Sequence, residues 1–287
     1  MLSRRRLLAL AVPTAALAAC SRPEGTSLER ARAVGAIRIG ISGERPYSYT
    51  NPDGRVTGAQ PEVARIVLDR IGVPGLEAVR VPFHQLLPRL RDGQYDLVAA
   101  GMTITPERCR EVAFSRPDFV AYPAFLVREG NPPGVRTFQG VARAHLRLAV
   151  IEGTVEIDYA RAAGVTDDQL VIVASQSEML RAVSEGRVDA GALTRLSLLD
   201  ELRRNPGSGL VVTAPVEPTA DGRPVVPAAG FAVRHGETDL LAEFDRELAA
   251  LQASGEWLRI TEPFGFTRDN LPPPELTTED LCRPERP

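Results

Sequence analysis

The sequence of residues 96–108 is Asp96-Leu97-Val98-Ala99-Ala100-Gly101-Met102-Thr103-Ile104-Thr105-Pro106-Glu107-Arg108. Its apolar first half predicts a buried strand. Its second half predicts a helix start, because Thr105 can cap a helix whose first residue is Pro106. The hydroxyl and free backbone N–H groups of such a start attract anions, and Arg108 can hold both oxygens of a carboxylate in a planar fork. A capped helix with a solvated surface arginine is the alternative.

Short β-branched runs alternate with helical patterns on both sides of this stretch. This alternation predicts parallel β-sheets covered by helices. The first series comprises strand 37–41, helix 61–71, strand 76–81, helix 84–90 and strand 95–100. A similar second series comprises strand 146–151, helix 155–163, strand 170–174, helix 176–186 and strand 188–193.

The sequence predicts two further apolar strands. Strand 124–128 lies between the two series, and strand 230–233 follows the second. We interpret them as crossovers that join two α/β lobes. The helix predicted over 239–252 has an apolar stripe at helical spacing and should pack back on the first lobe. Two facing lobes form a cleft lined by strand-to-helix loops, and residues 103–108 form one such loop.

The N-terminus has the pattern of an export signal. Ser3-Arg4-Arg5-Arg6 precedes an apolar run from Leu7 to Leu17, which is shorter than the roughly 20 residues of a membrane span. Leu17-Ala18-Ala19-Cys20 resembles the bacterial lipoprotein cleavage box, which predicts that Cys20 carries a lipid and anchors the chain at the outer face of the cytoplasmic membrane. An ordinary secretory signal is the alternative, and the adjacent arginines leave both the Sec and the twin-arginine routes open.

Charge and cysteine content narrow the function further. The chain has 34 basic and 37 acidic residues among 287 and no long block of like charge, so nucleic acid is not an expected partner. In an oxidising compartment Cys109 and Cys282 favour a disulfide, with two buried free thiols as the alternative. His84, His145 and His235 share no ligand spacing, so the sequence predicts neither a metal nor a cofactor.

The whole chain after the signal resembles the family 3 solute-binding proteins of ABC importers. The resemblance rests on five pieces, none of which is specific by itself. They are Arg38-Ile39-Gly40 with Pro46-Tyr47-Ser48-Tyr49, Gly58-Ala59-Gln60-Pro61-Glu62-Val63-Ala64, Gly101 to Arg108, Glu152-Gly153-Thr154, and Gly186-Arg187-Val188-Asp189-Ala190.

The resemblance implies a bilobed α/β fold of the type II periplasmic-binding-protein kind, whose two crossovers act as a hinge. We expect a signal over 1–20, a tether over 21–35, a first lobe made of 36–128 and 230–287, and a second lobe made of 129–229. It also implies a receptor, here a monomer, that closes on a small solute and docks on permease subunits. Arg108 should hold the solute carboxylate with help from the Gly153-Thr154 loop of the other lobe. Thr103 and Thr105 are expected to line the same site, and closure should bring Thr154 and Thr194 to the solute.

Thr194 departs from the amino acid receptors of this family, which usually place an aspartate there for the α-ammonium group. A hydroxyl cannot neutralise a desolvated ammonium, so an ordinary α-amino acid is disfavoured unless Glu44 serves instead.

A narrower resemblance to ectoine and hydroxyectoine receptors rests on Pro263 to Thr267 and on Glu107-Arg108-Cys109. It implies that Glu44, Tyr47 and Phe83 surround a delocalised cation. A third aromatic usually completes that box, and its position here is Thr103. Either Tyr49, Phe119 or Tyr122 fills the gap, or the solute is a related polar compound. Tyr47 and Phe83 as packing aromatics, and Glu44 as a solvated carboxylate, are the structural alternatives.

The sequence thus predicts a receptor without enzymatic activity that captures a zwitterionic carboxylate, with ectoine or hydroxyectoine preferred. A polar amino acid receptor, an enzyme resembling cyclohexadienyl dehydratase with Glu44 or Glu152 as its acid, and a receptor that serves a sensor kinase are the alternatives.

Overall fold

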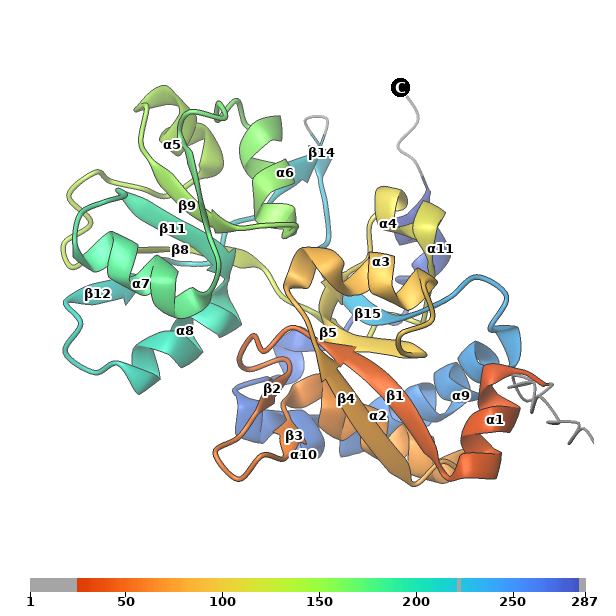
Figure 1. Ribbon diagram of the computed structural model, residues 1–287. Helices are drawn as coiled ribbons and strands as arrows, with labels where there is room; N and C mark the ends of the chain where they lie inside the picture. Colours follow the sequence, from red (N-terminus) through yellow and green to blue (C-terminus); the bar gives the residue numbers. More distant parts are fainter. Residues whose placement is uncertain (1–24, 221–222, 284–287) are drawn as a thin grey trace, which may run out of the picture.

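Two mixed β-sheets organise the chain, one in each of two α/β lobes (Figure 1). The computed structural model describes residues 25–220 and 223–283. The arrangement confirms the predicted bilobed α/β fold.

The sheet of lobe 1 has the strand order β4-β1-β5-β15-β6, and β7 pairs with β15 as well. Strands β1, β4 and β5 are parallel, whereas β15 runs antiparallel to β5, β6 and β7. The strands are β1 (Ala36–Ile41), β4 (Gly75–Arg80), β5 (Leu97–Thr103), β6 (Ala113–Phe114), β7 (Phe119–Val120) and β15 (Ala228–Val233). A two-stranded ribbon, β2 (Tyr49–Thr50) with β3 (Val56–Thr57), lies beside them.

Helices cover both faces of this sheet. The long helix α9 (Thr238–Ser254) buries Leu240, Phe244, Leu248 and Leu251, at the spacing that the sequence predicts, in the same core cluster as strands β1 and β15. The other helices of lobe 1 are α1 (Ser27–Val34), α2 (Ala59–Arg70), α3 (Leu86–Arg91), α4 (Pro106–Glu111), α10 (Glu256–Thr261) and α11 (Thr278–Cys282), with 3₁₀ turns η1 (Phe83–Gln85), η2 (Glu262–Phe264) and η3 (Arg268–Asn270).

Lobe 2 repeats the pattern on a smaller scale. Its sheet has the order β10-β9-β11-β8-β12, in which β9, β10 and β11 are parallel. The strands are β8 (Pro123–Arg128), β9 (Leu148–Ile151), β10 (Leu170–Val173), β11 (Ala190–Thr194) and β12 (Leu210–Val212), and the helices are α5 (Phe138–Arg143), α6 (Val155–Ala162), α7 (Gln176–Ser184) and α8 (Arg195–Arg204). A short hairpin joins β13 (Thr219–Ala220) to β14 (Arg223–Pro224).

The first lobe boundary lies earlier than the sequence predicts. Strand β8 pairs antiparallel with β11 and β12, so residues 123–128 belong to lobe 2 and not to lobe 1. The strands predicted as crossovers, 124–128 and 230–233, are instead strands of the two sheets. The chain crosses between the lobes just before β8 and just before β15, where the N–H of Ala121 donates to the carbonyl of Pro227 at 3.1 Å and that of Val216 to the carbonyl of Pro123 at 2.8 Å.

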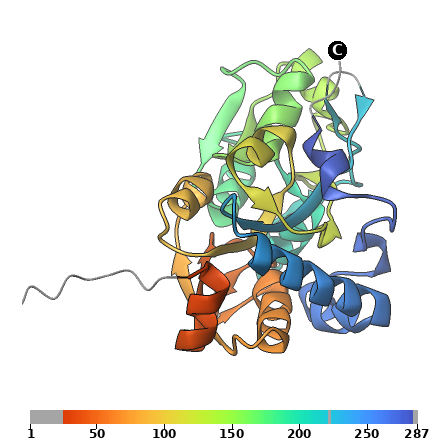
Figure 2. The same ribbon diagram turned by 90° about the vertical axis from the view of Figure 1, so that its right-hand side faces the viewer.

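The predicted tether over 21–35 is wrong for its second half. Helix α1 occupies residues 27–34 and lies against α9 (red and blue in Figures 1 and 2), and Leu28 is only 1% exposed. Thr26 caps this helix in a capping box with Glu29, a signature that marks a helix start. The predicted signal over 1–20, the lipidated Cys20 and residues 21–24 of the tether lie outside the described residues. Within the described part, no helix is both long and apolar enough to cross a membrane.

Candidate functional site

The predicted site residues follow the carboxyl ends of parallel strands in both lobes. In lobe 1, β1 ends shortly before Glu44, and β5 ends at Thr103. In lobe 2, β9 ends two residues before Gly153, and β11 ends at Thr194. Because open α/β sheets bind ligands at these ends, the topology turns both sets of loops toward the boundary between the lobes.

Helix α4 begins as the sequence predicts. The Thr105 hydroxyl accepts from the backbone N–H of Arg108 at 3.2 Å, and Pro106 is the first helical residue. The Arg108 side chain then spans the two lobes. Its Nη1 donates to the carbonyl of Thr103 at 2.7 Å, and its Nη2 donates to the carbonyl of Gly153 in lobe 2 at 2.8 Å.

The guanidinium of Arg108 is half-buried between the two lobes. Its guanidinium carbon lies 5.6 Å from the centre of the Phe83 ring, which is within cation–π range. Burial lowers the pKa of Arg108, while Asp158 and Glu156 of lobe 2 act in the opposite direction. An arginine remains charged under such a shift, so this group can bind a carboxylate.

Glu44 is the oppositely charged member of lobe 1. Ser197, on helix α8 of lobe 2, donates its hydroxyl to Glu44 Oε1 at 2.5 Å. Burial raises the pKa of Glu44 to about 8, the Ser197 bond lowers it, and Glu156 raises it further. The solvated-loop alternative for Glu44 therefore does not describe this carboxyl group.

Tyr47 takes part in the site through its hydroxyl. Its oxygen lies 2.8 Å from the hydroxyl of Thr194, across the boundary between the lobes. The ring is 2% exposed and stacks on Phe119 with centroids 5.1 Å apart, and a Cβ added at Gly101 would lie only 2.7 Å from it. The ring is thus a core aromatic, as the structural alternative holds, whereas Phe83 lies half-buried beside Arg108.

The position of the third aromatic is not filled by Phe119 or Tyr49. Phe119 is buried in the lobe 1 core, and the ring of Tyr49 is covered by the Arg45 guanidinium at 3.5 Å. Thr103 itself is half-buried, and its carbonyl accepts from Arg108. Tyr122, the third candidate, is half-buried.

In lobe 2 the loop before helix α6 approaches lobe 1 closely. Gly153 has φ +80°, and a Cβ there would lie 2.8 Å from the Cβ of His84 and 2.9 Å from its Cα. Thr154 is buried, and its hydroxyl donates to the carbonyl of Ile151 at 3.0 Å. Next to this contact His84 Nδ1 lies 3.2 Å from Glu152 Oε2.

Glu156 is a site residue that the sequence reasoning missed. It lies in the first turn of α6, is 2% exposed, and is close enough to Glu44, Tyr47 and Arg108 to shift the pKa of each. Burial raises its own pKa to about 7. An acidic residue in a first helical turn usually stabilises the helix dipole, so its residue type and position did not distinguish it.

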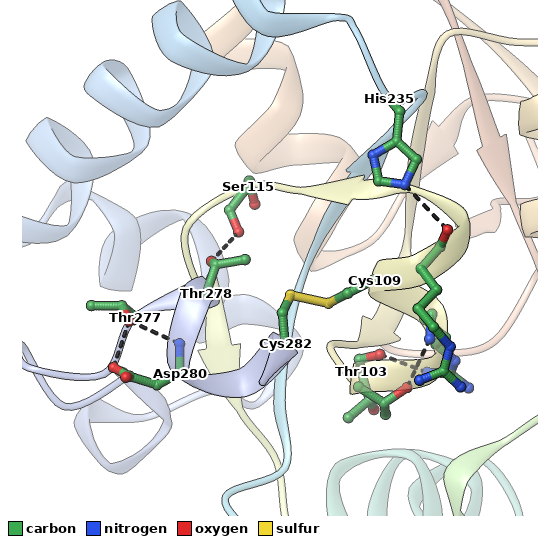
Figure 3. The surroundings of a disulfide bond; sticks show 11 residues. Thr103, Cys109, Ser115, His235, Thr277, Thr278, Asp280 and Cys282 are labelled. Atoms are coloured by element: carbon green, nitrogen blue, oxygen red, sulfur yellow. Dashed lines mark hydrogen bonds between the residues drawn. A yellow bond between two sulfur atoms is a disulfide. The ribbon is translucent and has the colours of Figure 1, made fainter. Parts of the chain in front are cut away.

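The predicted disulfide is present. Cys109 and Cys282 are joined with their Cα atoms 5.6 Å apart, which fastens α11 to α4 (Figure 3). The Thr278 hydroxyl adds a bond to the carbonyl of Ser115 at 2.7 Å. The disulfide therefore attaches helix α4, which carries Arg108, to the C-terminal helix α11. Among the described residues, no group of three or more His, Cys, Asp or Glu side chains could hold a metal.

Comparison with known proteins assigns most of the chain to one family. A family model described as "Bacterial extracellular solute-binding proteins, family 3" matches residues 37–267. A probable amino-acid ABC transporter periplasmic-binding protein of Sinorhizobium fredii is 30% identical over 89% of this chain and 86% of its own length. The L-arginine-binding protein of Pseudomonas aeruginosa is 28% identical over 79% of this chain and 87% of its own length.

Solved structures agree with these sequence matches. The crystal structure of EhuB in complex with hydroxyectoine superposes with a TM-score of 0.81 at 33% identity, covering 90% of this chain and 98% of that one. An ancestral arginine-binding protein bound to arginine gives 0.71 at 26% identity, covering 81% and 99%. From the matched family model, the fold and these relatives, the chain belongs to the bacterial extracellular solute-binding proteins, family 3.

Proposed function

We propose that this protein captures a small solute carrying one carboxylate and one cationic group, closes its two lobes on it and delivers it to an ABC permease. Family members bind small amino-acid-like solutes and work with such permeases, outside the cytoplasm. The proposed finer step is the pairing of the solute carboxylate with Arg108 and of its cation with Glu44.

The observation that carries this proposal is the pairing state of these two side chains. Within residues 25–220 and 223–283, neither Arg108 nor Glu44 has an ion-pair partner within 4.0 Å. Their hydrogen-bond partners in the other lobe are uncharged: the Gly153 carbonyl for Arg108 and the Ser197 hydroxyl for Glu44. Burying unpaired opposite charges is costly. A zwitterion that bridges them would lower that cost only when both lobes are in place, which is the differential affinity that drives closure.

Two kinds of cargo fit this pair of charges. Ectoine or hydroxyectoine is supported by the EhuB relative, whose structure contains hydroxyectoine, and by Phe83, whose ring can face a delocalised cation. A polar amino acid is supported by the arginine-binding relatives and by the packing of Tyr47, whose stacked ring leaves the aromatic box with fewer open faces.

A solute panel tests the proposal. We expect the melting temperature of the purified protein to rise with ectoine, hydroxyectoine, L-arginine or L-glutamine, and calorimetry to rank their affinities. A solute without a carboxylate, or one without a cationic group, serves as the control and should give no shift. If no zwitterion in the panel shifts the melting temperature, the proposed cargo class is wrong. Turnover of prephenate or arogenate would instead favour the dehydratase alternative.

A further inference from the structure

Glu156 adds a buried carboxylate of lobe 2 to the half-buried Glu44 of lobe 1. It stands two residues after Thr154, at the start of α6, beside the Gly153 carbonyl that accepts from Arg108. It has no ion-pair partner within 4.0 Å among the described residues, although it is 2% exposed. A carboxylate this deep in a protein is ordinarily paired or involved in function.

Arg108 does not neutralise Glu156 directly. Both Nη atoms of Arg108 donate to backbone carbonyls, those of Thr103 and Gly153, and no oxygen of Glu156 lies within 4.0 Å of the guanidinium nitrogens. Asp158, the other acid near Arg108, is exposed and therefore compensated by water. The groups of the cleft without an ion-pair partner are thus two carboxyl groups, half-buried Glu44 and buried Glu156, and one half-buried guanidinium, that of Arg108.

The charge balance of these three groups depends on the cargo. A solute with one carboxylate and one cation leaves one of the two glutamates without a counter-charge. A solute with one carboxylate and two separated cationic groups compensates all three. A carboxyl group left without a cation in the closed cleft would bind a proton, whereas a solute with two cationic groups lets both carboxyl groups ionise and form charged hydrogen bonds. The second kind of solute therefore fits the closed cleft better.

The charges at the edge of the cleft also favour cationic solutes. A cavity of about 550 Å³ beside Arg108, between α4 of lobe 1 and α6 of lobe 2, is lined by four carboxylates and two arginines. The carboxylates are those of Glu107, Glu111, Glu152 and Asp158. Clefts lined by an excess of one sign raise the local concentration of solutes of the opposite sign.

We infer that Glu156 is a cation-binding residue contributed by lobe 2, and that the cargo is an amino acid with a cationic side chain. This inference rests on the proposed function, since it takes Arg108 as the carboxylate site. Glu44 and Glu156 then divide the two cationic groups between the lobes. The solute would therefore connect an anion of each lobe, and closure would depend on both.

L-arginine and L-citrulline test this inference, because they have nearly the same shape and differ in the charge of the side-chain end. We expect calorimetry at about pH 8 to give L-arginine at least a tenfold tighter binding than L-citrulline. Glu156→Gln should remove most of this difference by weakening L-arginine and leaving L-citrulline nearly unchanged. Glu156→Asp, which keeps the charge on a shorter side chain, should retain part of it.

Glu185→Gln is the matched control, because that side chain lies in lobe 2, is 54% exposed and does not line the cavity beside Arg108. It should keep the preference for L-arginine. Equal binding of both ligands by the wild type, or an unchanged ratio in Glu156→Gln, would overturn the inference. Tight binding of ectoine with no effect of Glu156→Gln would overturn it while leaving the proposed function intact. Binding of no zwitterion at all would overturn both.

Discussion

The hydroxyl of Tyr47 lies 2.8 Å from the hydroxyl of Thr194 and joins the two lobes across the cleft. Thr194 stands at the position for which the family resemblance predicts an aspartate, and here its hydroxyl makes a contact between the lobes. Because Tyr47 is also packed on Phe119, its hydroxyl is held in a fixed position from the lobe 1 side.

Replacing Tyr47 with phenylalanine should weaken closure without disturbing the fold. A neutral hydrogen bond contributes about 1 kcal/mol, so we expect solute affinity to fall roughly fivefold while the melting temperature of the empty protein changes little. Thr194→Val should have a similar effect, and the double variant should be no worse than either single one. Fully additive losses in this cycle would show that the two hydroxyls do not act together.

Arg108→Ala should abolish the capture of carboxylate solutes. Truncating one partner of a buried charge pair costs about 2–5 kcal/mol, so we expect affinity to fall by roughly a hundredfold or more. Arg108→Lys should recover only part of it, because an ammonium lacks the planar fork. Arg110→Ala, an exposed arginine on the same helix, is the control. Undiminished binding in Arg108→Ala would disprove the carboxylate site.

The empty closed form should become less favourable as the pH rises. Burial raises the pKa of Glu44 to about 8 from its ordinary value of 4.5, and that of Glu156 to about 7. Between pH 4.5 and about pH 8, the closed form therefore binds more protons than an open form in which both carboxyl groups are solvated. Its relative stability is therefore fully present below pH 4.5 and is lost as the pH rises toward 8.

Small-angle scattering of the empty protein checks this expectation. The radius of gyration should increase between about pH 5 and pH 9, as the closed population decreases. The groups that face Glu44 include Ser197 and Glu156 of lobe 2 and the Tyr47 hydroxyl of lobe 1, so Glu44→Gln combined with Glu156→Gln should flatten the response. A pH response that is the same in this double variant would assign the titration to other groups.

Gly153→Ala should oppose closure by a steric effect. A Cβ at this position would lie 2.9 Å from the backbone of His84 in the other lobe, and the residue has φ +80°. Gly164→Ala is the matched control, because Gly164 has φ +88° but its nearest neighbour would be 3.9 Å away. We expect similar losses of stability in both variants, and a loss of solute affinity in Gly153→Ala alone. Equal affinities would contradict the close approach of the lobes at this point.

The sequence predicted what local patterns determine. The cap at Thr105, the stripe of α9 and the pairing of Cys109 with Cys282 depend on nearby residues or on a pair of rare ones, and the structure contains all three. The first lobe boundary was placed wrongly because an apolar strand such as 123–128 fits either sheet. Only its pairing with β11 and β12 decides between them.

The site was predicted less completely, because a cleft joins residues far apart in the chain. Nothing near Glu156 in the sequence distinguishes it from an ordinary acid in a first helical turn; its role follows from the loops that bury it beside Glu44 and Arg108. Tyr47 shows the opposite error. A matching position indicated a ligand-facing ring, whereas Phe119, distant in sequence, stacks on that ring.

Removing the disulfide should affect both stability and binding. Helix α4 is six residues long and has no fully buried residue, so it depends on the bond from Cys109 to Cys282 in α11 for its attachment to the tail. Loss of a native disulfide costs about 2–5 kcal/mol, and α4 also carries Arg108. We expect Cys282→Ser to lower the melting temperature and to weaken solute binding, and a reductant to do the same to the wild type only.

Thr278→Val, which removes the bond to Ser115 but keeps the disulfide, should have the smaller effect on both quantities. Unchanged affinity in Cys282→Ser would mean that Thr105 and Pro106 alone fix the position of Arg108.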